Sequence, residues 1–107
     1  MGFNLKSPSG KTENPKLEMS RPVRIEPHVR SMIDGDGAVL LDLKAGRYYS
    51  LNGVGAKIWT RAEKGMTPSE ILADLQQTYR IPQEQLAVDL AAFVVAMEER
   101  GLLRARP

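Results

Sequence analysis

The spacing of hydrophobic residues changes along the chain, from every second position before residue 52 to every third or fourth position after it. Residues 38–43 and 47–51 are short runs of strand-forming side chains, and the stretch between them, 44–46, ends in glycine. Two such runs joined by a short loop predict an antiparallel hairpin. Residues 22–29 also alternate, and because a proline interrupts them we expect an edge strand or a bulge there. Residues 34–37, Asp-Gly-Asp-Gly, predict a turn.

A first helix is predicted after Asn52, which is a good N-cap residue. Val54, Ile58 and Trp59 share one face of this helix, which ends near Gly65. Apolar residues spaced in this way mark the face that packs on the core, so we expect the indole of Trp59 to be buried.

A second helix begins at the clearest local signal in the sequence. Thr67 is the N-cap, Pro68 stands at the first helical position, and Glu70 completes a capping box. Apolar side chains recur three and four residues apart along this helix, at Ile71, Leu72, Leu75 and Tyr79. The helix ends before Pro82, because a residue that precedes proline disfavours helical torsion angles.

Pro82 opens a third, longer helix, for which Gly101 is a plausible stop. Its apolar stripe consists of Leu86, Leu90, Phe93 and Met97, which we expect in the core. Leu102 and Leu103 follow as an apolar tail that can fold back on the core. Strands followed by three helices predict an α+β domain, here over residues 21–107.

Residues 1–20 carry two prolines, several lysines and serines, and few large apolar side chains. A segment of this composition cannot bury enough apolar surface to fold, so we expect a flexible N-terminal segment or a tag. Met19 is a second candidate for the natural start of the chain.

Composition restricts the function classes. The chain has 107 residues, 42% of them apolar and 26% charged, as in a single globular domain. The absence of cysteine excludes thiolate catalysis and iron–sulfur ligation, and it fits a reducing cytoplasm. No apolar run approaches the roughly 20 residues that span a bilayer, and no secretory signal is present, so we expect a cytoplasmic protein with no membrane partner. A net charge of +2 gives little support to nucleic-acid binding.

Groups that could perform catalysis are scarce. His28 is the single histidine, and a lone histidine is more often a surface or packing residue than a catalyst. The Gly-Val-Gly at 53–55 lacks the third glycine of a phosphate-binding fingerprint. Residues 34–37 lack the glutamate that a calcium loop has at its twelfth position. We therefore expect no enzymatic activity, no metal and no cofactor.

Four motifs follow one another between residues 36 and 103. Residues 46–52 read Gly-Arg-Tyr-Tyr-Ser-Leu-Asn, 55–59 read Gly-Ala-Lys-Ile-Trp, 65–71 contain Gly-Met-Thr and Glu-Ile, and 88–103 contain Val-Asp-Leu-Ala-Ala-Phe-Val and Gly-Leu-Leu. Their order and spacing resemble the PqqD-like family. The resemblance covers about 68 of the 107 residues.

The resemblance implies a winged helix-turn-helix-like fold, in which three antiparallel strands precede three helices. It also implies that the chain recognises the leader segment of a ribosomally made, post-translationally modified precursor peptide. Some members act with the radical enzyme of the pyrroloquinoline quinone pathway, and stand-alone members in lasso-peptide pathways pass the precursor to a leader peptidase. The doubled tyrosine and the Ile-Trp pair look closer to the lasso type. The expected partners are therefore a precursor leader peptide and a leader peptidase or a radical or cyclase modifying enzyme.

The expected peptide-binding residues come from the last strand and the third helix. In the family the leader is added as a strand at this position, and an open sheet edge is in general a template for an extended peptide. The strand contributes Arg47, Tyr48, Tyr49, Ser50 and Leu51, of which Tyr49 and Leu51 face the core by alternation. The helix contributes Val88, Asp89, Ala92, Phe93 and Ala96. The two alanines leave room for a bulky leader side chain, and Asp89 can meet a basic one.

Two other functions stay open on the sequence alone. Winged-helix folds are shared with DNA-binding proteins, although the second helix offers only Gln76 and Gln77 beside Glu70 and Asp74, which is a poor surface for phosphates. A generic protein-interaction subunit would use the same sheet edge. In addition, a Pro-x-Leu match and a Phe-Asn-Leu match before residue 18 raise the hypothesis that the N-terminal segment docks at the site as a pseudo-ligand.

Overall fold

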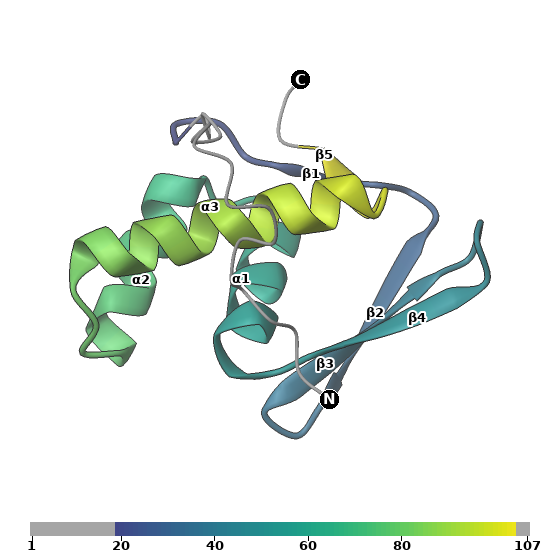
Figure 1. Cartoon of the computed structure of the whole chain (residues 1–107), viewed down its shortest axis with the longest axis horizontal. Coiled ribbons are helices and arrows are strands. Elements are labelled where there is room, and N and C mark those ends of the chain that lie inside the picture. Colours follow the sequence, from purple (N-terminus) through teal and green to yellow (C-terminus); the bar gives the residue numbers. More distant parts are fainter. Residues whose placement is uncertain (1–18, 105–107) are drawn as a thin grey trace.

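The computed structural model describes residues 19–104. The predictions for residues 1–18, including the pseudo-ligand matches, lie outside the described residues. The elements in chain order are β1 (Arg24–Ile25), β2 (Val29–Asp34), β3 (Gly37–Asp42), β4 (Arg47–Leu51), α1 (Gly53–Glu63), α2 (Pro68–Thr78), α3 (Gln83–Glu99) and β5 (Leu103–Arg104). The predicted α+β class is confirmed, with an antiparallel sheet of three strands followed by three helices (Figure 1).

β2, β3 and β4 form one antiparallel sheet in that order. A two-residue turn joins β2 to β3, since Asp34 pairs with Gly37. Gly35 in this turn has a φ of 62°, a left-handed conformation that glycine adopts without steric cost. β4 pairs with β3 along its whole length, with Tyr49 opposite Leu40. The predicted hairpin of residues 38–51 and the predicted turn at residues 34–37 are thus confirmed.

The first strand of this sheet lies later in the chain than the alternation at 22–29 predicted. That stretch holds the short β1, which pairs with β5 as a separate two-stranded sheet, with Ile25 opposite Leu103. The strand that pairs with β3 is β2. It was missed because its neighbouring Met32 and Ile33 are both exposed and give no inward–outward alternation.

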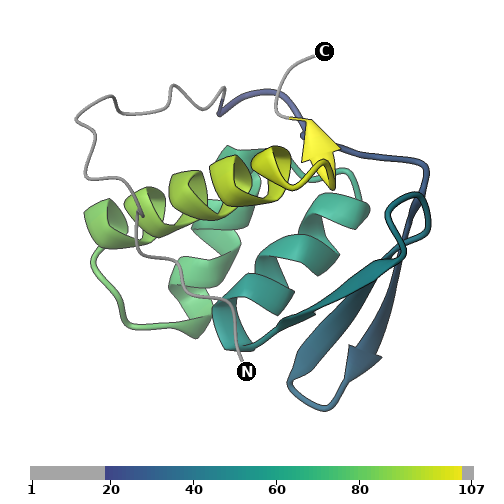
Figure 2. The ribbon, with the colours of Figure 1, turned by 45° about the vertical axis from the view of Figure 1, so that its right-hand side comes forward.

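The helices lie to one side of the three-stranded sheet (Figures 1 and 2). Asn52 occupies the N-cap position of α1, although its side chain makes no capping hydrogen bond. The capping box of α2 is present: the Thr67 hydroxyl accepts from the Glu70 N–H at 3.1 Å, and the Glu70 carboxylate accepts from the Thr67 N–H at 2.9 Å. α3 ends at Glu99 with Arg100 as its C-cap, and Gly101 follows with a φ of 75°.

The core joins the helices to the inner face of the sheet. Its largest fully buried side chains include Trp59, Phe93, Leu40, Ile58, Ile71, Leu75, Leu86, Leu90, Met97, Leu102 and Leu103. The predictions for Trp59, for the apolar stripe of α3 and for the apolar tail after Gly101 are therefore confirmed. Met19 also packs against this core, and its carbonyl accepts a hydrogen bond from the Ser69 N–H at 3.0 Å.

Candidate functional site

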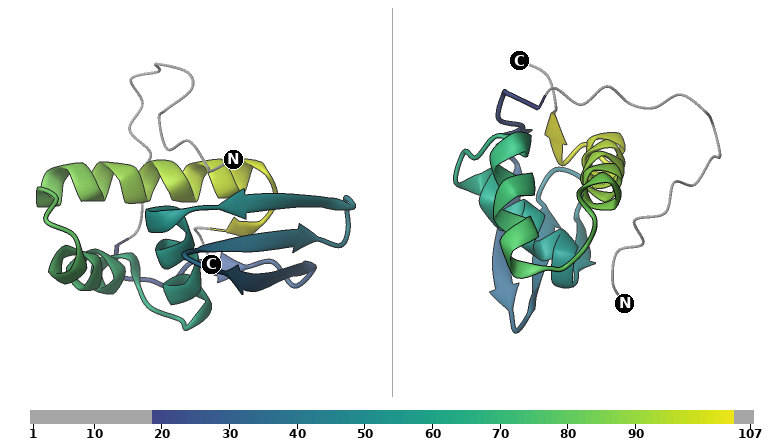
Figure 3. Two further views of the ribbon diagram at one scale, coloured as in Figure 1. Left: turned by 90° about the horizontal axis from the view of Figure 1, so that it is seen from below. Right: turned by 90° about the vertical axis from the view of Figure 1, so that its left-hand side faces the viewer.

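β4 is the last strand of its sheet, so one of its two edges faces no neighbouring strand among residues 19–104. A strand in this position directs part of its backbone N–H and C=O groups away from the sheet, where they can pair with another chain. α3 runs along the β4 side of the sheet (Figure 3). The two elements that the sequence predicted for the site thus lie on the same side of the sheet, and their role in peptide binding stays a prediction.

The side chains of β4 divide between the two faces of the sheet. Leu51 is buried in the core and Tyr49 is half-buried against it, as expected. Tyr48 is 73% exposed on the opposite face, and Arg47 and Ser50 are exposed as well. Main-chain groups of β4 are therefore the part of this strand best placed to hold a peptide, because the inward side chains are already used for packing.

The predicted residues of α3 are graded in exposure. Phe93 is fully buried, Asp89, Ala92 and Ala96 are half-buried, and Val88 is 66% exposed. Val88, Asp89, Ala92 and Ala96 form a strip beside the buried stripe of the helix, and the two alanines occupy its C-terminal half. A partner that reaches this strip meets apolar surface with one carboxylate at Asp89.

Phe93 links α3 to the end of β4 through a glycine. An added Cβ at Gly55 would lie 3.2 Å from Cε1 of Phe93 and 4.0 Å from Cβ of Leu51. Both side chains therefore pack against the backbone of α1 at this point. This contact explains in physical terms why the Gly-Ala-x-Ile-Trp motif begins with glycine. Phe93 thus belongs to the core that lies between α3, α1 and the end of β4.

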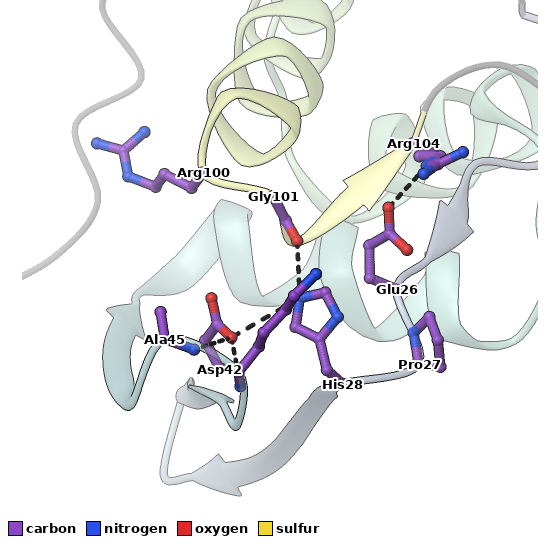
Figure 4. Close-up of a pocket in the computed structure, with 9 residues that line it drawn as sticks. Glu26, Pro27, His28, Asp42, Ala45, Arg100, Gly101 and Arg104 are labelled. Carbon is purple, nitrogen blue, oxygen red and sulfur yellow. Dashed lines mark hydrogen bonds and ion pairs between the residues drawn. The ribbon is translucent and has the colours of Figure 1, made fainter.

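A pocket of about 580 Å³ lies between the end of α3 and the turn that joins β3 to β4 (Figure 4). It is lined by Glu26, Pro27, His28, Asp42, Lys44, Ala45, Arg100, Gly101 and Arg104. The Arg104 guanidinium is paired with Glu26 at 2.8 Å between Nε and Oε2. Nε2 of His28 lies 3.1 Å from the Gly101 carbonyl oxygen and 3.7 Å from Oδ1 of Asp42.

Asp42 holds the turn before β4. Its Oδ1 accepts hydrogen bonds from the backbone N–H groups of Lys44 at 2.9 Å and Ala45 at 3.0 Å. The bond from Ala45 is the main reason why the pKa of Asp42 lies below its ordinary value; partial burial opposes this shift, while the bond from Lys44 and the nearby His28 add to it. The carboxylate is therefore ionised and engaged at neutral pH.

Sequence reasoning did not identify this cluster. His28 was noted only as a lone histidine, because Gly101 lies 73 residues away in the chain and no local motif connects them. Among the described residues, no group of three or more histidine, aspartate or glutamate side chains is arranged to hold a metal ion. None of the helices in this part of the chain has the length and apolar character that crossing a membrane requires.

An unpaired strand edge is a surface to which an extended peptide can add as a further strand. The family model for coenzyme PQQ synthesis protein D, PqqD, matches residues 37–103. The chain belongs to the PqqD family.

Two solved structures share this fold. The chain is 32% identical to TbiB1, solved in complex with the TbiA(beta) leader peptide, with a TM-score of 0.75 over 78% of this chain and 98% of that one. It is 29% identical to a lasso peptide synthetase B1 complexed with the leader peptide, with a TM-score of 0.71 over 77% and 96% of the two chains. No curated relative matches the chain.

Proposed function

We propose that this protein binds the leader segment of a ribosomally synthesised precursor peptide, in a pathway of the lasso-peptide type. The leader lies along the outer edge of β4 and against α3. The observation that carries the proposal is the open edge of β4 beside α3, in a fold shared with two proteins whose structures contain leader peptides. Main-chain bonds to β4 supply an affinity that depends little on sequence.

Specificity comes from the strip on α3. Ala92 and Ala96 are one helical turn apart and half-buried, so a bulky leader side chain can enter between the helix and β4. Val88 adds apolar surface at the rim, and Asp89 favours a basic leader residue over an acidic one. Phe93 forms the base of the site, and Tyr48 and Ser50 take part through their backbone.

The protein acts as a carrier in this proposal and performs no chemistry. It presents the leader in the cytoplasm to a leader peptidase or to a cyclase or radical modifying enzyme. The absence of cysteine fits a reducing compartment. Binding by strand addition leaves the segment that follows the leader extended and accessible, which is what a modifying enzyme needs.

DNA binding has no comparable support. α2 and α3 contain no lysine or arginine, whereas they carry Glu70, Asp74, Glu84, Asp89, Glu98 and Glu99. A helix that enters the major groove needs cationic or amide side chains near phosphates and bases. The second and third helices would instead repel the backbone of a duplex.

The direct test is a binding titration with fluorescent peptides. Two probes are used, namely the TbiA(beta) leader peptide and the leader of the precursor encoded beside this protein's gene, each with a scrambled version as control. Saturable binding of either leader, with no binding of its scrambled version, supports the proposal. Failure of both leaders to bind at high protein concentration contradicts it.

A further inference from the structure

We propose that His28 is a positioning residue for the peptide site: its imidazole ties the end of α3 to the turn that precedes β4, and so sets the spacing between the two sides of the site. This inference rests on the proposed function, since it assigns the residue that holds the two peptide-contacting elements in register.

The imidazole makes a defined contact with the α3 side. Nε2 of His28 is 3.1 Å from the Gly101 carbonyl oxygen (Figure 4). A carbonyl oxygen only accepts hydrogen bonds, so the bond requires the proton on Nε2. Gly101 is the residue at which α3 stops, with its N–H bonded to the Glu98 carbonyl and the next N–H bonded to the Met97 carbonyl. The bond from His28 therefore fixes the C-terminal end of the helix.

His28 is attached equally firmly to the β4 side. Its own carbonyl oxygen accepts a hydrogen bond from the Leu43 N–H at 2.9 Å, and Leu43 directly follows β3. Its imidazole is 3.7 Å from Oδ1 of Asp42, the carboxylate that holds the turn into β4 through two backbone N–H groups. One residue thus contacts both the end of α3 and the start of the hairpin turn.

The surrounding packing makes this tie important. The pocket of about 580 Å³ lies between the two sides at this end. Elsewhere the spacing is set by the core, for example where Phe93 packs at Gly55 beside Leu51. At the pocket end, the residues before β2 connect the two sides through polar contacts. The imidazole of His28 lies between the Gly101 carbonyl and the Asp42 carboxylate.

The backbone attachments of this segment stay in place when the imidazole is removed. The Glu26 N–H donates to the Leu102 carbonyl at 3.0 Å, and β1 pairs with β5. A His28→Ala variant is therefore expected to fold, with a looser spacing between α3 and β4. The effect on stability is that of one partly exposed hydrogen bond, whereas the effect on leader binding is larger because the site must be re-formed.

The experiment compares His28→Ala, His28→Gln and Ser31→Ala with the wild type. Glutamine retains an N–H donor at a similar reach to Nε2. Ser31→Ala is the matched control, because it removes a hydrogen bond of 2.5 Å from the Ser31 hydroxyl to Glu63, which joins β2 to α1 away from the pocket. Affinity for whichever of the two fluorescent leader peptides the wild type binds and the urea midpoint are measured for each protein.

We expect His28→Ala to bind the leader about five-fold more weakly, His28→Gln to recover most of this loss, and Ser31→Ala to bind like the wild type. Equal affinity of His28→Ala and wild type would overturn the inference while leaving the proposed function intact. A loss in Ser31→Ala that matches its loss of stability would also overturn it, since affinity would then follow stability alone. If the wild type binds neither of the two leaders, the proposed function fails and the inference falls with it.

Discussion

Tyr48 and Tyr49 are neighbours in the chain but lie on opposite faces of β4. Tyr48 is 73% exposed on the outer face of the sheet, whereas Tyr49 is half-buried against the core and stands opposite Leu40 of β3. The alternation of a strand produces this division. It separates the part of the strand that packs on the core from the part that faces solvent.

Replacing each tyrosine with alanine is expected to have different effects on stability. Tyr49→Ala lowers the free energy of unfolding by about 2 kcal/mol, because a half-buried ring is lost from the core. Tyr48→Ala changes it by about 0.5 kcal/mol or less, as for most exposed positions. Urea unfolding of the two variants measures both values, and similar losses in the two would contradict the assignment of faces.

Ala92 of α3 gives a direct test of the peptide site. Ala92→Leu is expected to weaken leader binding by about ten-fold, because the larger side chain fills the space left for a leader residue. Ala73→Leu is the matched control, since Ala73 is an exposed alanine on α2. The affinity of the leader peptide is compared in the two variants, and an unchanged affinity in Ala92→Leu would place the leader elsewhere.

Asp42 makes the stability of the hairpin depend on pH. Its pKa is lowered in the folded protein, chiefly by the Ala45 N–H, so its ionised form stabilises the fold at neutral pH. This contribution to the free energy of unfolding is complete above the ordinary aspartate pKa of about 3.9. It is lost as the pH falls through the lower pKa that Asp42 has in the folded protein. Unfolding by urea between about pH 7 and pH 3 should show Asp42→Asn less stable than the wild type at neutral pH. The difference should shrink at the acidic end. A difference that stays constant, or grows, on acidification would be inconsistent with this role.

Gly37 lies where β3 begins and is close to the end of β4. A Cβ added there would collide with the carbonyl group of Leu51. Gly37→Ala is therefore expected to displace the end of β4 and to lower the free energy of unfolding by roughly 2 kcal/mol. Asp36→Ala, at the exposed neighbouring turn position, is the control and should change stability by about 0.5 kcal/mol or less. Thermal or urea unfolding distinguishes the two, and equal stability of Gly37→Ala and wild type would show that β4 tolerates the shift.

Much of this architecture could be predicted because the relevant signals are local. The capping box at Thr67 and the apolar stripe of α3 each occupy one stretch of sequence, and both predictions are confirmed. β2 was missed because its side chains at Met32 and Ile33 are both exposed, which conceals the period of a strand. Side chains at the edge of a sheet need not alternate when neither face is covered there.

The site could be predicted in part for the same reason. β4 and α3 carry family motifs, so the sequence alone predicted them as the two sides of the peptide site, and this assignment stays a prediction. The contact between His28 and Gly101 joins positions 73 residues apart, and no spacing rule connects a histidine before a strand to a glycine after a helix. Only the folded chain shows that the segment before β2 returns to the end of α3.

Amide hydrogen exchange with and without leader peptide tests the central claim most directly. In the free protein, the N–H groups on the outer edge of β4 should exchange rapidly, because no strand protects them. Saturating TbiA(beta) leader peptide should slow their exchange and shift the resonances of Val88, Asp89, Ala92 and Ala96, with β2 at the opposite edge unchanged. Protection that appears at β2 instead, or at neither edge when leader is bound, would contradict strand addition at β4.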